Sequence, residues 1–198
     1  YNREKNQRSG MDSFYSQKEL QSMGFPSLGD NVLISRKASI YGIERISVGS
    51  NVRVDDFCIL SGKIELGDYI HIAAYSALYG GEEGIFIDDF VNLSSRISVY
   101  SVSDDYSGET MTNPMISEQY KNVENNPVKI EKHVIVGATS VILPGAVLRE
   151  GSAFGSFSFI IQDSEPWSIN AGIPARKIKN RKRNLLELER KMMEAVGS

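Results

Sequence analysis

The sequence contains very little cysteine and histidine and no long hydrophobic run. Its 198 residues include one cysteine, Cys58, so no disulfide can form within the chain, and a reducing compartment is expected. The most apolar stretch, 134–148, is interrupted by glycine and proline and is shorter than the roughly 20 residues that cross a bilayer. Basic residues number 22 and acidic residues 25, which does not favour nucleic acid binding. We therefore predict a single-domain cytoplasmic protein with no membrane span.

The first ten residues are polar and basic, and they lack the apolar segment of a secretory signal. Because they precede Met11, we interpret residues 1–10 as a remnant of the expression vector, with the native start at Met11. A natural polar arm is the alternative.

Large apolar residues recur at every sixth position along most of the chain. The positions are Leu28, Ile34, Ile40, Val48, Val54, Leu60, Leu66, Ile72, Leu78, Ile87, Leu93, Val99, Ile130, Val136, Ile142, Leu148, Phe154 and Ile160. A second series, four residues later, is small or apolar and includes Val52, Cys58, Ser76 and Ser140. A period of six fits neither a helix nor a long alternating strand. It predicts short strands and sharp corners that build a three-sided coil, whereas an irregular β-sandwich is the weaker alternative.

The breaks in this period predict loops, and the ends of the chain predict helices. The largest break, about 103–129, is polar and predicts a protruding functional loop that leaves the third side of a coil. We expect a helical cap within 11–27, the coil over 28–166, and a coenzyme-binding segment with a C-terminal helix over 167–198. Helices at both ends are expected to cap the open stack.

Two segments carry a resemblance to a known family. The run PVKIEKHVIVGATSVILPGAVLREGSAFG and the later NAGIPARKIK are similar to the hexapeptide-repeat acyltransferases, which include galactoside, maltose and antibiotic acetyltransferases. The segments ISRKASIYG, HIAAYSALYGG and SDDYSG look most like sugar O-acetyltransferases of surface-polysaccharide clusters. The resemblance implies an all-β, left-handed parallel β-helix, because parallel crossovers are otherwise almost always right-handed.

The resemblance also implies an activity and an assembly. We expect an O-acetyltransferase that moves the acetyl group of acetyl-CoA directly to a sugar hydroxyl by general-base catalysis, without a metal. We also expect a homotrimer with active sites between subunits. An N-acetyltransferase for a nucleotide-linked amino sugar is the alternative, and a non-catalytic scaffold is the alternative outside the enzymes. A zinc carbonic anhydrase of this fold needs three histidines, and the chain has two.

The candidates for the general base are His71 and the acidic residues at the start of the long loop. His71 is one candidate, and a surface or inter-subunit structural histidine is the alternative. Relatives carry a base histidine at the foot of the long loop, where this chain has Asp104 followed by Asp105 and Tyr106. An aspartate ordinarily has a pKa near 3.9, which is low for a base. Either His71 is the base and an aspartate orients it, or the acidic pair binds substrate hydroxyls; a plain turn is the structural alternative.

Two further residues complete the expectations for the acceptor side. Ala73 aligns with a site-lining position of the galactoside relatives and is expected to bind the substrate. Tyr106, which follows the acidic pair, is expected to bind it too.

Two other residues are expected to have structural roles. His133 is expected to lie in a solvated turn, and Cys58 is expected to be a buried structural thiol.

The coenzyme site is expected near the C-terminal coils. Gly137 and Ala138 are equivalent to Gly155 and Ser156 on the next coil, and small residues let a pantetheine arm approach the backbone. The cations after Pro174 that are expected to contact the nucleotide phosphates are Arg176, Lys177 and Lys179. A solvated helix start is the alternative for these cations.

Overall fold

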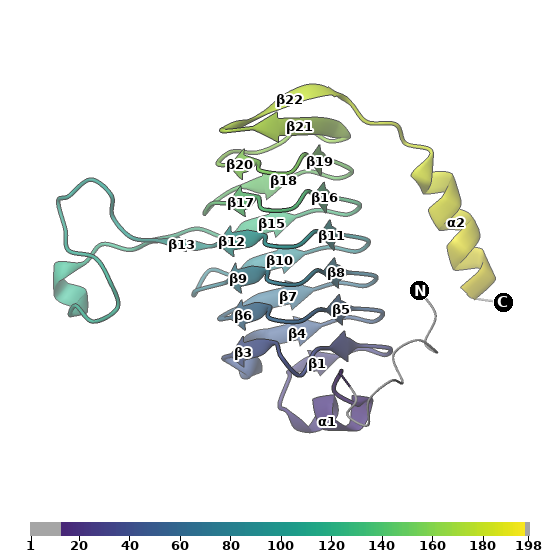
Figure 1. The fold of residues 1–198 in the computed structure, drawn as a ribbon, viewed down its shortest axis with the longest axis horizontal. Helices are drawn as coiled ribbons and strands as arrows, with labels where there is room; N and C mark the ends of the chain where they lie inside the picture. Colours follow the sequence, from purple (N-terminus) through teal and green to yellow (C-terminus); the bar gives the residue numbers. More distant parts are fainter. Residues whose placement is uncertain (1–12, 197–198) are drawn as a thin grey trace.

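Three parallel sheets form the three sides of a coil in the computed structural model, which describes residues 13–196. The first sheet contains β1 (Ser27–Leu28), β4 (Ile46–Val48), β7 (Ile64–Leu66), β10 (Ile85–Ile87), β15 (Val128–Ile130) and β18 (Val147–Leu148). The second contains β2 (Leu33–Ile34), β5 (Arg53–Val54), β8 (His71–Ile72), β11 (Asn92–Leu93), β16 (Ile135–Val136), β19 (Ala153–Phe154), β21 (Ser168–Gly172) and β22 (Ala175–Asn180). The third contains β3 (Ser39–Tyr41), β6 (Ile59–Ser61), β9 (Ala77–Tyr79), β12 (Ser98–Tyr100), β17 (Val141–Ile142) and β20 (Phe159–Ile160). Successive coils stack in sequence order, which confirms the predicted β-helix of hexapeptide repeats (Figure 1).

The six-residue period is the register of the stacked coils. In the second sheet Val54 pairs with Ile72, Ile72 with Leu93, and Leu93 with Val136. These side chains are fully buried, and burial of each aliphatic side chain contributes about 1.5–3 kcal/mol. The expected inward positions are confirmed except in the first coil, where Leu28 and Ile40 are only partly buried.

The corners of the coil adopt a left-handed backbone conformation. We call the turns between the first and second sheets the first corner, those between the second and third sheets the second corner, and those after the third sheet the third corner. The residues with positive φ at the second corner are Phe57, Tyr75, Arg96, Thr139 and Phe157. Bulky residues rarely adopt this conformation, so it could not be predicted from the residue types at these positions.

The long loop leaves the stack at the third corner. It starts with β13 (Val102–Ser103), which pairs antiparallel with β14 (Glu124–Asn125), and it holds the 3-10 turn η3 (Glu118–Tyr120). A second 3-10 turn, η2 (Ile43–Arg45), follows β3 at an earlier third corner. The loop extends away from the coil, as predicted (Figure 1).

The two ends of the stack are covered differently. Helix α1 (Gln17–Ser22) is capped by Ser16 and buries Leu20 beneath the first coil, as expected. Helix α2 (Leu185–Val196) forms as predicted, but the expectation that it caps the stack is wrong. The antiparallel hairpin of β21 and β22 covers the last coil, and α2 runs back along the side of the stack (Figure 1). Among the described residues, no helix could cross a membrane.

Helix α2 is attached to the stack by two contacts of Glu189. Its carboxylate lies 2.6 Å from the Lys132 amine and 2.8 Å from Nε2 of His133. His133 stacks on Phe90 and is 7% exposed, so the expected solvated turn is wrong. Its backbone does occupy a corner, with φ of 62°, but α2 covers the side chain.

Candidate active site

The predicted coenzyme residues form one column at the second corner. Residues before the corner pair in register between coils, Val136 with Phe154 and Phe154 with Asn170. Gly137 and Ala138 therefore lie directly below Gly155 and Ser156 in the stack, and Ala171 lies above them. Arg176 pairs with Ala171, so it stands at the upper end of the same column. The structure brings these predicted residues together.

Gly137 has a second physical reason to be glycine. A Cβ at this position would lie 2.4 Å from the backbone nitrogen of Ser156 and 2.7 Å from the carbonyl carbon of Gly155. At Gly155 the nearest atom would be the Cβ of Ala171, at 3.2 Å. Close stacking of the coils alone therefore requires glycine at 137, apart from any contact with a coenzyme.

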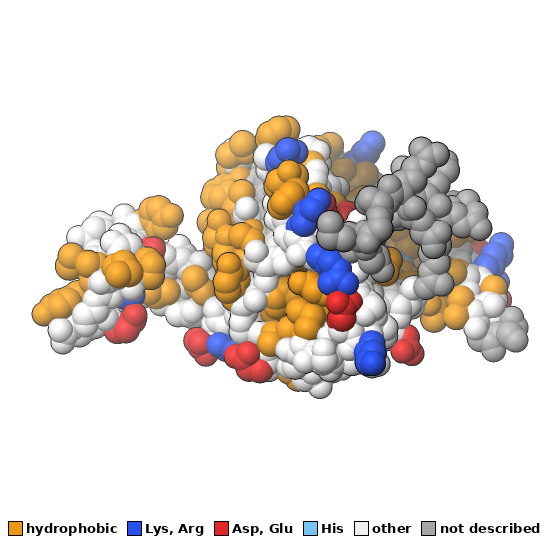
Figure 2. All heavy atoms as spheres, turned by 60° about the horizontal axis from the view of Figure 1, so that its bottom comes forward, with side chains coloured by type: hydrophobic (Ala, Val, Ile, Leu, Met, Phe, Trp, Pro, Cys, Tyr) orange, Lys and Arg blue, Asp and Glu red, His pale blue; other side chains and the backbone are white. Residues whose placement is uncertain are grey.

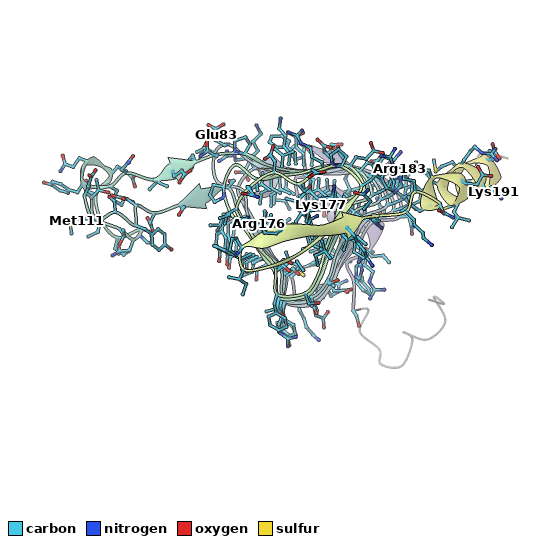
Figure 3. The ribbon with its side chains drawn as sticks, turned by 90° about the horizontal axis from the view of Figure 1, so that it is seen from above. Glu83, Met111, Arg176, Lys177, Arg183 and Lys191 are labelled. Atoms are coloured by element: carbon cyan, nitrogen blue, oxygen red, sulfur yellow. The ribbon has the colours of Figure 1, made fainter. Side chains whose placement is uncertain are left out.

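The three predicted cations differ in what they contact. Lys177 forms an ion pair of 2.5 Å with Glu165, whereas Arg176 donates only to the backbone oxygen of Ala175, at 3.0 Å. Neither Arg176 nor Lys179 is ion-paired within residues 13–196, and both are exposed on β22 rather than at a helix start. Figure 3 shows Arg176 and Lys177 on the hairpin that covers the stack. The guanidinium of Arg176 is thus free to meet an anion.

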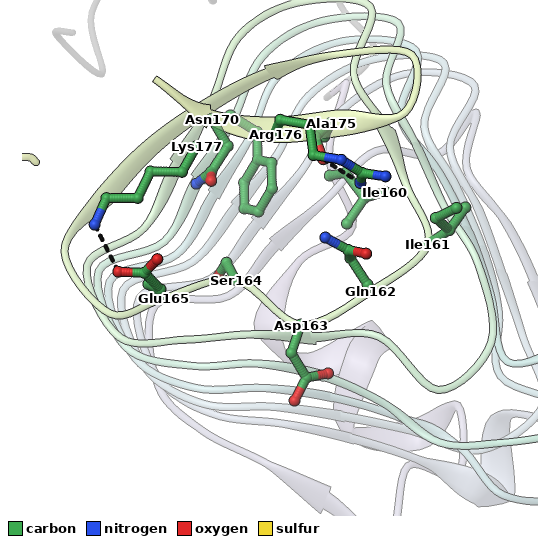
Figure 4. Close-up of a pocket in the computed structure, with 11 residues that line it drawn as sticks. Ile160, Ile161, Gln162, Asp163, Ser164, Glu165, Asn170, Ala175, Arg176 and Lys177 are labelled. Carbon is green, nitrogen blue, oxygen red and sulfur yellow. Dashed lines mark hydrogen bonds and ion pairs between the residues drawn. The ribbon is translucent and has the colours of Figure 1, made fainter. Parts of the chain in front are cut away.

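A cavity of about 90 Å³ lies beneath this hairpin. Its lining includes Gln162, Asp163, Asn170 and both Arg176 and Lys177 (Figure 4). The space is small and polar, and the Lys177–Glu165 pair borders it. It marks the end of the column that a bound anion would approach.

His71 is the centre of a hydrogen-bonded ladder on the outer face of the second sheet. Its Nε2 lies 2.8 Å from Asp55 Oδ2, and its Nδ1 lies 3.1 Å from Asn92 Oδ1. The other oxygen of Asp55 accepts from Nε of Arg53, at 2.7 Å. Both ring nitrogens of His71 are therefore occupied by this chain, and the sequence did not reveal these partners.

The acidic loop residues have different surroundings. Asp105 accepts hydrogen bonds from the backbone and side chain of Thr110 and from the backbone of Ser107. The Ser107 side chain first, and then the Thr110 side chain and the Ser107 backbone, lower the pKa of Asp105 to about 2. A carboxylate with so low a pKa is a poor base, and Asp105 instead closes the turn that begins the loop. Asp104 is exposed, and Tyr106 is 93% exposed.

The structure does not bring His71 and Asp104 together within one chain. His71 lies on the second sheet, whereas Asp104 follows the third corner, which is opposite that sheet (Figure 1). Ala73 begins the second corner on the coil of His71, and Ser94 occupies the same position on the next coil. Sequence analysis missed Ser94, although the six-residue period places it in the column of Ala73 and Gly137.

The Cys58 thiol is not placed to act as a nucleophile. Its thiol is buried at the second corner and donates to the backbone oxygen of Ala73, at 3.3 Å. Burial raises its pKa to about 11, which confirms the expected structural thiol. Residues 13–196 contain no group of three or more histidine, cysteine or acidic side chains that could hold a metal ion.

A relative with similar sequence identifies the family. The dTDP-4-amino-4,6-dideoxy-D-glucose acyltransferase of Escherichia coli is 47% identical over 180 residues, which are 89% of this chain and 93% of that protein. The chain belongs to the hexapeptide-repeat acyltransferases. No protein-family profile matches it.

A solved structure is also similar to this chain over nearly its whole length. AntD, an N-acyltransferase from Bacillus cereus in complex with dTDP and 3-hydroxybutyryl-CoA, is 54% identical, and the match covers 95% of this chain and 100% of AntD, with a TM-score of 0.92. Variants of AntD with a serine or an aspartate replaced, bound to dTDP and coenzyme A, match with a TM-score of 0.91. The putative lipopolysaccharide O-acetyltransferase WbbJ of Escherichia coli K12 is 25% identical, over 74% of each chain.

Proposed function

We propose that this acyltransferase moves the acyl group of an acyl-coenzyme A to the amino group of a nucleotide-linked 4-amino-4,6-dideoxy sugar. The observation that carries the proposal is identity of 47% and 54%, over about nine-tenths of the chain, to two enzymes named for this class of acceptor or for N-acylation. Membership of an acyltransferase family argues against the scaffold alternative.

The acceptor atom is the point on which sequence analysis and the comparisons differ. The sequence favoured a sugar hydroxyl, and that interpretation has support only from distant relatives such as WbbJ, at 25% identity. The amine was the stated alternative, and the relatives with high identity favour it. An uncharged amine attacks a thioester carbon more readily than a hydroxyl does. As the C–N bond forms and the C–S bond breaks, the nitrogen loses one proton and the coenzyme A thiolate leaves.

The column at the second corner supports the coenzyme part of the proposal. Ala138 and Ser156 have small side chains, so a pantetheine arm that ran along this corner could approach the backbone and would end near Ser94. Arg176, at the other end of the column, would bind a phosphate of the nucleotide, because its guanidinium has no acidic partner in the described chain. The acyl donor would be acetyl-CoA or another short acyl-CoA.

Asp104 is better placed than His71 to take the proton. Its carboxylate is exposed, whereas both ring nitrogens of His71 are already bonded. The serine and the aspartate replaced in the AntD variants stand ten positions apart, as do Ser94 and Asp104. We propose Asp104 as the base and Ser94 as a residue that contacts the reacting groups.

An acceptor comparison tests the proposed function. Thiol release from acetyl-CoA and from 3-hydroxybutyryl-CoA would be followed with dTDP-4-amino-4,6-dideoxyglucose and with the matching sugar that carries a 4-hydroxyl. We expect acylation of the amine and little reaction with the hydroxyl sugar. Preferential acylation of the hydroxyl would restore the O-acetyltransferase interpretation.

The base is tested by two variants assayed with one acceptor. Asp104→Asn is expected to lower kcat by about 10²–10⁴-fold, as loss of a general base does. The KM for the acyl-coenzyme A should not change, because Asp104 lies outside the coenzyme column. His71→Gln is the matched control and should retain most activity. The reverse order would return the base to His71.

A further inference from the structure

An exposed ladder of aromatic and cationic side chains continues the second corner below the coenzyme column. Phe57 and Tyr75 stack with their ring centroids 5.0 Å apart. Lys37 lies 5.3 Å from the centroid of Phe57, and the guanidinium of Arg96 lies 5.3 Å from the centroid of Tyr75. The four side chains come from successive coils, and we call them the corner ladder.

The rings of the corner ladder are not needed by the core. Phe57 is 47% exposed and Tyr75 is 54% exposed, although their φ values of 61° and 64° are unfavourable for bulky residues. Positive φ recurs at the first corner, where Asn31 and Asn51 adopt it at less cost, and where Tyr69 and Phe90 also adopt it. Phe57 and Tyr75 differ from Tyr69 and Phe90 in their greater exposure, which leaves their rings open to a ligand.

The corner ladder contains one free cation. Lys37 forms an ion pair of 2.8 Å with Asp56, which largely neutralises it. Arg96 is exposed and forms no ion pair within residues 13–196. An anionic group that approached the corner ladder would therefore meet the Arg96 guanidinium, with the rings of Tyr75 and Phe57 beside it.

The position of the corner ladder matches the order of groups in the proposed acceptor. If the coenzyme lies along the column above Ser94, the lower coils are the part of this corner that is left open to the acceptor. Arg96 is in the same corner turn as Ser94, and Tyr75 and Phe57 follow one and two coils below, at about 4.8 Å per coil. A nucleotide-linked sugar whose amine is at Ser94 would lay its diphosphate and then its base along this path.

We propose that the corner ladder binds the nucleotide of the acceptor, with the diphosphate on Arg96 and the pyrimidine base packed against the exposed rings of Tyr75 and Phe57. This inference rests on the proposed function. Guanidinium groups pair well with phosphate oxygens. The faces of Phe57 and Tyr75 are covered by each other and by the two cations, so a base would contact the exposed ring edges. The corner ladder would thus select a nucleotide-linked amino sugar over the free amino sugar.

Binding of dTDP to the full-length protein tests the subsite. Phe57→Asn and Tyr75→Asn remove a ring but keep a residue that tolerates positive φ, and each is expected to weaken dTDP binding about tenfold in calorimetry. Arg96→Gln is expected to weaken dTDP by about the same factor and also to weaken pyrophosphate, which the two ring variants should bind as the wild type does. In each variant the KM for the acceptor should rise while the KM for the acyl-coenzyme A stays constant.

The control uses a similar pair elsewhere on the coil. Lys63 lies 5.1 Å from the ring centroid of Phe86 on the first sheet, and Phe86→Ala should leave dTDP affinity unchanged. If the wild type binds dTDP and acylates the dTDP-linked amine while the three ladder variants bind dTDP normally, the subsite is wrong and the proposed function stands. If the wild type binds no dTDP and does not acylate the amine, both proposals are overturned.

Discussion

Gly137 shows how closely successive coils approach one another at the second corner. From sequence it was interpreted as space for a pantetheine arm, and the structure adds that a Cβ there would overlap the backbone of the next coil. The two reasons can be separated, because the clash exists in the absence of any coenzyme. Backbone atoms cannot move aside as the end of a long side chain can. A larger residue at 137 would therefore lower the stability of the fold.

Gly137→Ala is therefore expected to destabilise the protein without coenzyme by about 1–3 kcal/mol, as overpacking does. Denaturant unfolding followed by circular dichroism measures the change. Gly155→Ala is the matched control one coil above. The new methyl group would lie 3.2 Å from the Cβ of Ala171 and 3.8 Å from the backbone oxygen of Asn170, so a smaller loss is expected. Equal stability of Gly137→Ala and the wild type would show that the coils separate easily.

Helix α2 depends on its contacts with the side of the stack rather than on burial of its own. None of its residues is fully buried, and its closest polar contacts with the coil run through Glu189 to Lys132 and His133. Burial opposes ionisation of Glu189, but the hydrogen bonds from Lys132 and His133 outweigh it and hold the pKa below its usual value. A lowered carboxylate pKa means that this stabilisation is present above the ordinary pKa and is lost as the pH falls through the folded-state value.

Glu189→Gln is expected to loosen α2 and to raise the amide exchange rates of Leu185–Val196 roughly tenfold, while exchange in the coil stays the same. Hydrogen exchange with mass spectrometry resolves the two regions. Glu187→Gln is the matched control, because within residues 13–196 Glu187 pairs only with Arg190 and Lys191 of the same helix. The wild-type helix should loosen in the same way on acidification, and an unchanged helix in Glu189→Gln would place its anchor elsewhere.

Several large apolar side chains of the long loop are exposed in the single subunit. Tyr106, Met111, Met115 and Tyr120 expose large apolar surface on the loop, which stands away from the coil (Figure 2). The loop starts at the third corner, whereas the coenzyme column lies at the second corner. Within one subunit, Asp104 and Arg176 are therefore at different corners of the coil. If both residues act in one site, the loop of one subunit has to meet the second corner of another. We expect the homotrimer that the resemblance implied.

Subunit mixing tests this arrangement. Asp104→Asn and Arg176→Ala subunits should each be nearly inactive, the first through loss of the base and the second through weak coenzyme binding. After the two are unfolded and refolded together, a heterologous interface would give about one intact site in four. We expect activity to return to about that level, with sedimentation that reports a trimer. No recovery in a mixed trimer would place both residues in the site of one chain.

The hexapeptide period, the loop and the terminal helices were predictable from the sequence. So was the alignment in one column of the residues assigned to the coenzyme, because it depends on neighbours a fixed number of residues apart. The small residues at 137 and 155 follow from that repeat, as does the buried Cys58. The partners of His71 were not predictable, since Asp55 and Asn92 reach it from other coils through side-chain geometry. The cover that α2 provides for His133 was missed for the same reason, because 56 residues separate His133 from Glu189.

The sequence by itself thus determined the coil and the family, because a local period of six decides which side chains face inward. Only the tertiary structure decided which polar groups are free to act. Both ring nitrogens of His71 contact other side chains, Asp105 bonds within the loop, and Lys177 pairs with Glu165. Asp104, Arg96 and Arg176 have no ion-pair partner in the described chain. Hydrogen-bond and ion-pair partners depend on distances of about 3 Å between segments far apart in sequence, and no local pattern encodes them.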